Sequence, residues 1–464
     1  MSDVLLSQAE GEPIPLYLVA EAALETFLAG QPPLVARLAA LSDFKAKAGQ
    51  ALAVPGETNG EGLAVFGLGS KAKADGMAFR ALPAKLPAGD YRIVQAPEGV
   101  ALETIALAWA LGAYGFDRYR QKPADPKPRL VLEGVDLAET RNLAQACALA
   151  RDLVNTPAND MGPVQVEMAA REVAEAFGAT FSVVAGDDLL TENYPAVHAV
   201  GRAADPKRAP RMIEITWSGG GVHAPLIAVV GKGVVFDTGG LDIKPSAGMR
   251  LMKKDMGGAA HALALGRMIM VARLPVRLVV LVPAVENAIS GDAMRPGDVL
   301  ASRKGLSIEV GNTDAEGRLI LADALTRAGE LNPDLTIDLA TLTGAARVAL
   351  GPQVIPFYTA DESLAGDLAK AAETVGDPLW RLPLWAGYEP ALDSDIADLK
   401  NDPDGWAQAG SVTAALFLQR FAPASAWVHL DIFAWNPRGQ PGFPAGAEAQ
   451  AIRALFEVLK GRYA

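Results

Sequence analysis

Two short stretches of this sequence are dense in residues that could do chemistry. One is the glycine-rich run VGKGVVFDTGGLDIKPSAGMRLMKKDMGGAA, residues 230–260, and the other is NTDAEGRLILADAL, residues 312–325. Seven glycines fall from residue 231 to residue 258, and glycine lets a backbone approach a bound group closely. The candidate residues in the two stretches are Lys232, Asp237, Lys244, Asp255, Asp314 and Glu316.

The four acidic residues of this set lie at or near the ends of predicted strands. In α/β sheets ligands gather at the carboxyl ends of the strands, so we expect these acids to meet there. Four negative charges without counter-charge would repel one another strongly. Two divalent cations about 3.5–4 Å apart would neutralise them and would hold a water that deprotonates near neutral pH. The combination therefore favours a two-metal site, although each acid alone would be a capping or turn residue.

Three rival kinds of binding site do not fit these stretches. Residues 312–323 resemble a calcium-binding loop, but they begin with Asn312 rather than Asp, end with Asp323 rather than Glu, and follow a strand-like run rather than a helix. A phosphate-binding loop needs Ser or Thr after its lysine, whereas Gly233 follows Lys232. No predicted strand leads into G-x-G-x-x-G with a helix behind it, so a dinucleotide loop is not predicted. As single residues, Asp314 and Glu316 could complement the dipole of a helix predicted to begin near Leu319.

Composition limits the partners of the chain. The 42 basic and 54 acidic residues give a net charge of −12, which disfavours bulk binding to nucleic acid or to anionic membranes. No window approaches the roughly 18 apolar residues of a membrane span. The histidines show no metal-ligand spacing, so a conventional histidine zinc site is not predicted. The four are His198, His223, His261 and His429.

The single cysteine, Cys147, cannot form an internal disulfide, which fits a reducing compartment. The acidic N-terminus shows no basic region ahead of an apolar core, so no export signal is predicted. We therefore expect a cytoplasmic protein.

The length of 464 residues favours two domains. Short apolar strands alternate with helical stretches in the first part, an α/β pattern. The second part has near-continuous apolar runs typical of strands buried on both faces, separated by helical stretches such as 257–274 and 319–331. We predict an α/β protein with a smaller N-terminal α/β domain, residues 1–136, a connecting helix, residues 137–154, and a larger C-terminal α/β domain, residues 155–464.

The two stretches together closely resemble the leucyl aminopeptidase family, the cytosolic two-metal peptidases. The similarity continues through ARDLVNTPAND, VENAISGDAMRPGDVL, DLATLTGA, LWRLPLWAGY, SDIADLKN and AGSVTAALFLQRF. It implies a mixed-sheet C-terminal peptidase domain with helices on both faces, and an activity that releases N-terminal residues, leucine-like ones preferred, from peptides. It also implies a homohexamer built as a dimer of trimers.

The resemblance further implies two metal sites. The family's tight site falls on Lys232, Asp237, Asp255 and Glu316. The exchangeable site falls on Asp237, Glu316 and both the side chain and the backbone carbonyl of Asp314. A hydroxide bridging the two ions would attack the peptide carbonyl. Zinc and manganese fit this donor set best, and cobalt and magnesium remain alternatives.

Other residues take roles from the same resemblance. Lys232 could ligate only as a neutral amine, so we expect burial and the two nearby cations to hold its pKa far below the free value. Lys244 corresponds to a charged lysine that polarises the scissile carbonyl, and Arg318 to an arginine that helps to hold bicarbonate as general base. The family's side-chain pocket falls on Met252, Thr341 and Gly344, although a core role rivals the pocket role of Met252.

The sequence departs from the family pattern at three positions and leaves two other functions open. Arg250 and Lys254 replace what are often an acid and a small residue, and Asp242 stands where a serine is common. A two-metal phosphoesterase would use the same clamp but usually recruits histidines, which are scarce here. A DNA-binding or scaffolding role also stays open, because some family members bind DNA, although the net charge does not support it.

Overall fold

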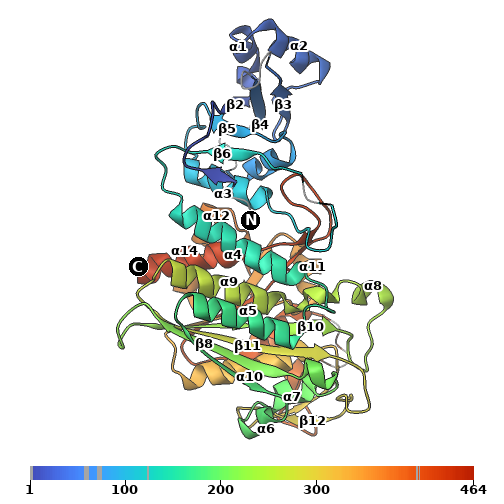
Figure 1. Ribbon diagram of the computed structural model, residues 1–464. Coiled ribbons are helices and arrows are strands. Elements are labelled where there is room, and N and C mark those ends of the chain that lie inside the picture. Colours follow the sequence, from blue (N-terminus) through green and yellow to red (C-terminus); the bar gives the residue numbers. More distant parts are fainter. Residues whose placement is uncertain (1–3, 57–61, 71–75, 123–124, 404–405, 407) are drawn as a thin grey trace. The chain divides into compact units, whose positions relative to one another are not determined.

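A computed structural model describes residues 4–56, 62–70, 76–122, 125–403, 406 and 408–464 (Figure 1). The chain forms two compact units, one of residues 1–148 with 436–446 and the other of residues 149–435 with 447–464. Segment 436–446 thus belongs to the first unit, although the sequence predicted one continuous C-terminal domain. Helix α4 (Ala138–Asn155) covers the stretch predicted as the connecting helix.

The first unit is built on a six-stranded sheet with the order β1-β6-β5-β2-β4-β3. Neighbouring strands are parallel except for the antiparallel pair β3 and β4. Its longest described helix within residues 4–137, α3, buries Ile105 through Leu111. The strands are β1 (Leu5–Leu6), β2 (Ile14–Ala20), β3 (Ala51–Val54), β4 (Leu63–Gly69), β5 (Asp90–Ile93) and β6 (Arg129–Val131), and the helices are η1 (Glu21–Ala23), α1 (Leu24–Ala29), α2 (Pro33–Leu41), η2 (Gly76–Ala84) and α3 (Leu102–Gly112).

The second unit is built on a mixed nine-stranded sheet with the order β16-β15-β18-β14-β9-β11-β8-β7 and with β10 beside β11. Strands β18, β14, β9, β11 and β10 are parallel, whereas β8 and β15 run antiparallel to their neighbours β11 and β18. The strands are β7 (Thr180–Ala185), β8 (Arg211–Ser218), β9 (Leu226–Gly231), β10 (Gly233–Asp237), β11 (Arg277–Asn287), β14 (Leu335–Ala340), β15 (Ile355–Tyr358), β16 (Leu379–Arg381) and β18 (Ala426–Asp431).

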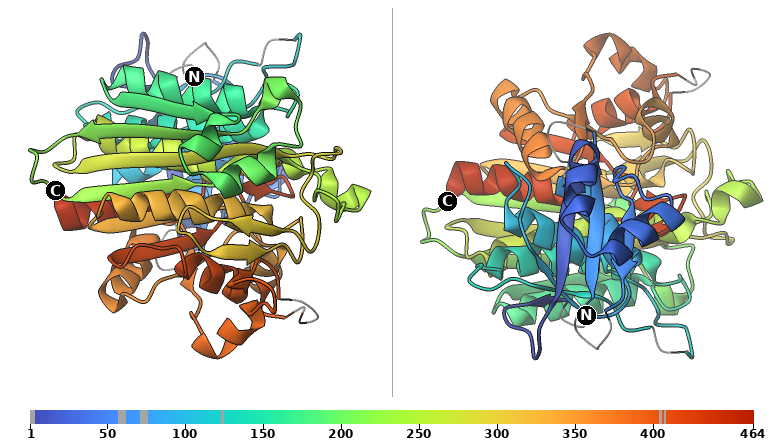
Figure 2. Two further views of the ribbon diagram at one scale, coloured as in Figure 1. Left: turned by 90° about the horizontal axis from the view of Figure 1, so that it is seen from below. Right: turned by 90° about the horizontal axis from the view of Figure 1, so that it is seen from above.

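Helices cover both faces of this sheet, as predicted (Figures 1 and 2). Helices α5, α9 and α14 pack together on one face, and α7 and α10 pack together on the other. Every residue of β9 and β14 is buried, because these central strands are covered on both sides. The helices of the unit are α5 (Pro163–Ala176), α6 (Asp188–Thr191), η3 (Pro206–Arg208), α7 (Pro195–Gly201), α8 (Ser246–Met249), η4 (Met252–Met256), α9 (Gly257–Val271), α10 (Glu316–Glu330), α11 (Gly344–Leu350), α12 (Glu362–Val375), η5 (Ala386–Leu392), α13 (Gly410–Gln419) and α14 (Ile452–Tyr463).

Two local predictions need correction. The strand-like run before the acidic turn forms a strand as predicted, β13 (Ser307–Glu309), but this strand belongs to a separate three-stranded sheet with β12 (Val299–Ala301) and β17 (Leu399–Lys400) and not to the main sheet. Its pairing with β17 lies too far along the chain for a local pattern to reveal. Helix α10 begins at Glu316 rather than near Leu319, so this carboxylate lies in its first turn.

Two short features complete the described chain. Strands β19 (Trp435–Asn436) and β20 (Gly446–Ala447) form a two-stranded ladder at the ends of segment 436–446. Among the described residues, no helix combines the length and the apolar character needed to cross a membrane.

Candidate metal centre

Lys232 lies between β9 and β10, and its backbone is fixed from two sides. Its N–H donates to the Leu339 carbonyl of β14, and its carbonyl accepts from Ala259 of α9. A side chain at Gly258 would meet the Leu339 carbonyl oxygen at 2.1 Å and the backbone nitrogen of Lys232 at 2.6 Å. A side chain at Gly317 would meet Nζ of Lys232 at 2.6 Å. These two glycines therefore allow α9 and α10 to approach the lysine closely.

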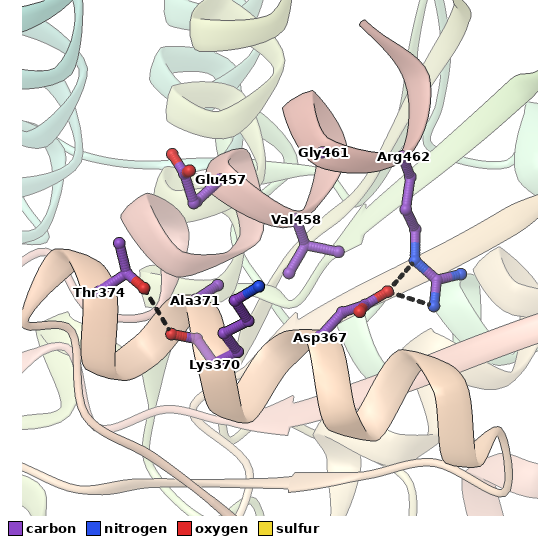
Figure 3. A pocket seen from close by; sticks show the side chains of 8 residues that line it. All are labelled: Asp367, Lys370, Ala371, Thr374, Glu457, Val458, Gly461 and Arg462. Atoms are coloured by element: carbon purple, nitrogen blue, oxygen red, sulfur yellow. Dashed lines mark hydrogen bonds and ion pairs between the residues drawn. The ribbon is translucent and has the colours of Figure 1, made fainter.

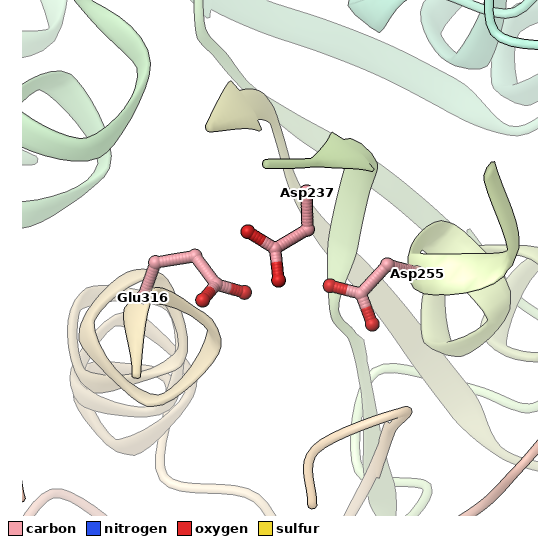
Figure 4. Close-up of side chains that lie close together, drawn as sticks. All are labelled: Asp237, Asp255 and Glu316. Carbon is pink, nitrogen blue, oxygen red and sulfur yellow. The ribbon is translucent and has the colours of Figure 1, made fainter. Parts of the chain in front are cut away.

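Three buried carboxylates converge beside Lys232 (Figure 4). Asp237 ends β10, Asp255 lies in η4 just before α9, and Glu316 is the first residue of α10. Each offers one oxygen, and these oxygens all lie within 4.8 Å of one another. Their residues are at most 2% exposed. The structure thus brings together three of the four acids that the sequence placed at strand ends.

Hydrogen bonds fix the orientation of two of these carboxylates. Oδ1 of Asp237 accepts from the Gly239 N–H and from Nδ2 of Asn287, each at 2.8 Å. Oδ1 of Asp255 accepts from the Thr341 hydroxyl at 2.8 Å. In both residues the other oxygen is left facing the cluster. An arrangement of this kind presents preoriented oxygen ligands to a cation.

The two lysines supply the positive charge of the cluster. Nζ of Lys232 lies 2.8 Å from Oδ2 of Asp255 and 2.9 Å from Oε1 of Glu316, and it donates to the Thr341 carbonyl at 3.2 Å. Nζ of Lys244 lies 2.8 Å from Oδ2 of Asp237 and forms an ion pair with Asp314. Asp314 lies outside the three-carboxylate group and joins it through Lys244.

The pKa values reflect this crowding. Burial, followed by the charge of Asp237, raises the pKa of Glu316 to about 8 and that of Asp314 to about 6. Burial alone would lower the pKa of Lys232, but Asp255, Glu316 and Asp237 outweigh it and hold the pKa above its ordinary value. The depressed pKa expected for Lys232 requires two bound cations beside it and stays a prediction. The carboxylates by themselves favour the ammonium form, and a neutral amine ligand would need the charge of bound cations to offset them.

The donor set fits divalent cations. Four oxygens of the cluster accept no hydrogen bond of good geometry within the described residues: Oδ2 of Asp255, Oδ1 of Asp314 and both carboxylate oxygens of Glu316. Lysine ammonium groups form ion pairs with three of them: Oδ2 of Asp255, Oε1 of Glu316 and Oδ1 of Asp314. Buried carboxylate oxygens without partners are costly unless a cation binds them. Lys232, Asp237, Asp255, Asp314 and Glu316 are the residues that could hold such ions.

Arg318 lies in the first turn of α10 and is buried. Its Nη1 donates to the Asn401 carbonyl at 2.6 Å, and its Nε has no hydrogen-bond acceptor in the part of the chain that the structure describes. Burial lowers the pKa of this guanidinium. A buried arginine with an unused donor could bind an anion.

The three predicted pocket residues differ in their surroundings. Thr341 is buried and holds Asp255 through its hydroxyl. Met252 is half-buried at the start of η4, and Gly344 is exposed at the start of α11, where a side chain would meet open space. The pocket role of all three stays a prediction.

Sequence reasoning missed residues that support the candidates. Asn287 ends β11 and holds Asp237, while Nδ2 of Asn401 donates to the carbonyls of Asn312 and Ala315. Asn287 could have been found, because it follows a predicted strand of the parallel set within the quoted run VENAIS. Asn401 could not, since no local pattern links it to a turn 86 residues earlier.

Two of the three residues that depart from the family pattern have contacts at the site. Lys254 is buried, and its Nζ lies 3.7 Å from Oδ1 of Asp255 and 5.3 Å from the Phe433 ring centroid. Arg250 is exposed. Asp242 bonds to Thr313, the residue before Asp314.

Two other features of the unit lie apart from the cluster. The groove between α12 and α14 holds a cavity of about 240 Å³, and none of its lining residues is a predicted site residue (Figure 3). Its lining residues are Asp367, Lys370, Ala371, Thr374, Glu457, Val458, Gly461 and Arg462. His261 and His429 are fully buried, as expected for packed histidines, and His429 pairs with Asp338 at 2.5 Å.

Comparison with known proteins decides the family. Residues 148–456 match the model of the cytosol aminopeptidase family, catalytic domain, and residues 14–133 match the M17 aminopeptidase, N-terminal domain.

The chain belongs to the cytosol aminopeptidase family.

Relatives of this family cover nearly the whole chain. A probable cytosol aminopeptidase of Syntrophotalea carbinolica is 40% identical over 425 residues, and the match covers 85% of each sequence. The crystal structure of cytosol aminopeptidase from Coxiella burnetii is 42% identical, with a TM-score of 0.93, and covers 99% of this chain and 100% of its own. The bottromycin maturation enzyme BotP, in complex with Mn, is 34% identical with a TM-score of 0.86, covering 97% and 99%.

Membership of the cytosol aminopeptidase family makes the chain an aminopeptidase, and it confirms the resemblance seen in the sequence. The two-domain α/β architecture is confirmed by the same matches.

Proposed function

We propose that this aminopeptidase is metal-dependent, binds two divalent ions per subunit and releases N-terminal residues from peptides, with leucine-like residues preferred. The observation that carries the proposal is the convergence of the Asp237, Asp255 and Glu316 carboxylates, with buried oxygens that accept no hydrogen bond. Four acids against Lys232 and Lys244 leave an excess of negative charge that divalent cations would neutralise.

The proposed ligand sets are those that the family resemblance implies. The tight site uses Lys232, Asp237, Asp255 and Glu316, and the exchangeable site uses Asp237, Asp314 and Glu316. The complex of BotP with Mn supports manganese, and one nitrogen among oxygen donors also suits zinc and cobalt better than magnesium. When bound, such ions would acidify water and polarise the scissile carbonyl.

The other predicted site residues stabilise the oxyanion, hold the general base and bind the N-terminal side chain of the substrate. Lys244 is half-buried, so its ammonium can reach a bound peptide and stabilise the oxyanion that develops at the first carbonyl. Arg318 holds bicarbonate as general base, supported by its unused, buried Nε donor. Met252, Thr341 and Gly344 line the pocket for the N-terminal side chain.

The cellular location and the oligomeric state of the enzyme are also proposed. Relatives are named cytosol aminopeptidases, which supports a cytoplasmic location. We propose a homohexamer arranged as a dimer of trimers, and light scattering on the purified protein measures its mass directly. A monomer at working concentration would overturn this arrangement.

Hydrolysis of leucine, lysine and proline amides by the purified protein tests the function. We expect leucine amide to be cleaved fastest, activity to disappear on chelation, and manganese, cobalt or zinc to restore it. An aryl phosphate ester serves as the control substrate for the rival phosphoesterase chemistry. Hydrolysis of the phosphate ester without amide hydrolysis would refute the proposal.

A further inference from the structure

Residue Asp242 bonds the loop that carries Lys244 to the turn that carries Asp314 and Glu316. Oδ2 of Asp242 accepts from the Thr313 N–H at 2.7 Å and from the Thr313 hydroxyl at 3.0 Å. The Asp242 N–H donates to the same hydroxyl at 2.9 Å. Two residues 71 positions apart in sequence are thus joined by three hydrogen bonds.

Thr313 is fully buried, and its N–H, its hydroxyl and its carbonyl all form hydrogen bonds in this region. Its single hydroxyl hydrogen is shared between Oδ2 of Asp242 and the Gly239 carbonyl, which lies 2.6 Å from the hydroxyl oxygen, and its own carbonyl accepts from Nδ2 of Asn287 at 3.1 Å. The same Asn287 amide holds Asp237. Thr313 is therefore bonded directly to the carboxylate of Asp242 and is connected through Asn287 to the carboxylate of Asp237.

The loop before Lys244 can approach Thr313 only because it carries two glycines. Gly239 and Gly240 have φ of +88° and +64°, a conformation that favours glycine. A side chain at Gly240 would meet the Thr313 side chain at 2.9 Å, and one at Gly239 would meet Oδ1 of Asp314 at 2.9 Å. The Lys244 N–H then closes the loop on the Thr238 carbonyl at 2.9 Å.

We propose that Asp242 and Thr313, called the latch below, are positioning residues that set the place of Lys244 relative to Asp237, Asp314 and Glu316. The proposal rests on the proposed function, because it assigns Lys244 to the reaction and the three acids to metal binding. Asp242 stands where a serine is common in the family, and a serine hydroxyl carries one oxygen on a shorter side chain. The carboxylate therefore gives this chain a firmer connection between the two segments.

The structure offers a matched control in Asp398. Its Oδ2 accepts from the Ser307 N–H and from the Ser307 hydroxyl, each at 2.8 Å, which is the same pair of bonds at the first residue of β13. No catalytic or binding role is assigned to Asp398 or to Ser307. Asp398→Ala thus removes equivalent hydrogen bonds without touching the latch.

The experiment compares Asp242→Ala, Asp242→Asn, Thr313→Val, the double variant Asp242→Ala/Thr313→Val and Asp398→Ala with the full-length wild type. Three quantities are measured: the dissociation constant for Mn²⁺ after metal depletion, kcat with KM on leucine amide, and the position of Lys244 in crystal structures. For Asp242→Ala we expect Mn²⁺ binding weakened about 10- to 100-fold, the range for lost outer-shell partners. We expect kcat to fall by a similar factor while KM changes less than about threefold.

The remaining variants separate positioning from charge and from stability. Asp242→Asn keeps an oxygen acceptor, so it should recover most of the loss, whereas an effect of negative charge alone would leave it as impaired as Asp242→Ala. The double variant should be no worse than Asp242→Ala, because both changes break one connection. Asp398→Ala should match the wild type in Mn²⁺ binding and kcat.

Three results would overturn the latch: Asp242→Ala indistinguishable from Asp398→Ala, no recovery in Asp242→Asn, or full additivity in the double variant. A wild type that neither binds Mn²⁺ nor cleaves amides would instead refute the proposed function. The crystal structures then decide the latch alone: Lys244 displaced from Asp237 in Asp242→Ala supports it, and an unmoved Lys244 overturns it.

Discussion

Replacing Lys244 by alanine should separate the two lysines of the cluster by role. Nζ of Lys244 lies 2.8 Å from Oδ2 of Asp237 and also pairs with Asp314, and its side chain is 15% exposed. Nζ of Lys232 contacts Asp255 and Glu316, and its side chain is only 3% exposed. We therefore expect Lys244 to act on substrate and Lys232 to act on the metal.

The expected size of the Lys244→Ala effect follows from its proposed contact with the developing oxyanion. Removing one such donor costs about 2.7–4 kcal/mol, or roughly 100- to 1000-fold in kcat. Metal affinity should not fall, because the change removes a positive charge that competes with cations for Asp237 and Asp314. Lys244→Arg should rescue poorly, since a planar guanidinium cannot occupy the place of a compact ammonium.

Lys232→Met is the matched variant, because it keeps side-chain volume and removes only the amine. It leaves Asp255 and Glu316 without their buried counter-charge, which should destabilise the metal-depleted protein by about 3–5 kcal/mol. It also removes a proposed ligand, so metal content should fall together with activity.

Elemental analysis, kcat and urea unfolding on both variants provide the assay. Metal retained with kcat lost in Lys244→Ala, and metal lost in Lys232→Met, is the expected pattern. The opposite pattern would refute the reasoning and exchange the two roles.

Three further predictions concern the metal ligands, Lys254 and His261. Glu316→Gln and Asp237→Asn should each weaken both ions, whereas Asp314→Asn should mainly deplete the exchangeable one; elemental analysis showing two ions at wild-type affinity in all three would contradict the ligand sets. Lys254→Met should tighten Mn²⁺ binding about tenfold in calorimetry, because a buried cation 3.7 Å from Asp255 is removed, and weaker binding would count against this view of its charge. Burial lowers the pKa of His261 from 6.5 to about 4. The fold therefore favours the neutral ring, and this contributes about 3 kcal/mol to the free energy of unfolding above pH 6.5. The contribution is lost as the pH falls from 6.5 to about 4. Urea unfolding should show that loss in the metal-depleted wild type and not in His261→Gln, and equal pH dependence of the two would refute it.

Local patterns in the sequence were enough to predict the sheet and the approach of the acids. The apolar runs indicated strands buried on both faces, and residues at the ends of parallel strands meet at one edge, where Asp237 lies; Asp255 instead reaches the cluster from η4. Glu316 joins them although β13 lies in another sheet, because α10 packs against β9 and β11 and brings its first turn to the cluster.

Contacts between distant segments were beyond the reach of those patterns. Asn401 holds the turn before Glu316 from 86 residues away, and Asp242 reaches Thr313 across 71 residues. The raised pKa of Lys232 depends on three carboxylates supplied by three separate elements, so spacing could give its neighbours but not the balance between burial and charge. Segment 436–446 joins the first unit for the same reason: its partners are set by tertiary structure.

Titration of the metal-depleted protein with Mn²⁺, with bound metal and leucine amide hydrolysis followed in parallel, tests most directly whether the carboxylate cluster is a metal centre that the peptidase needs. We expect no activity in the depleted protein, binding that saturates at two ions per chain, and hydrolysis that appears as the sites fill. Full hydrolysis with no bound metal, or an absence of Mn²⁺ binding in an active enzyme, would contradict it.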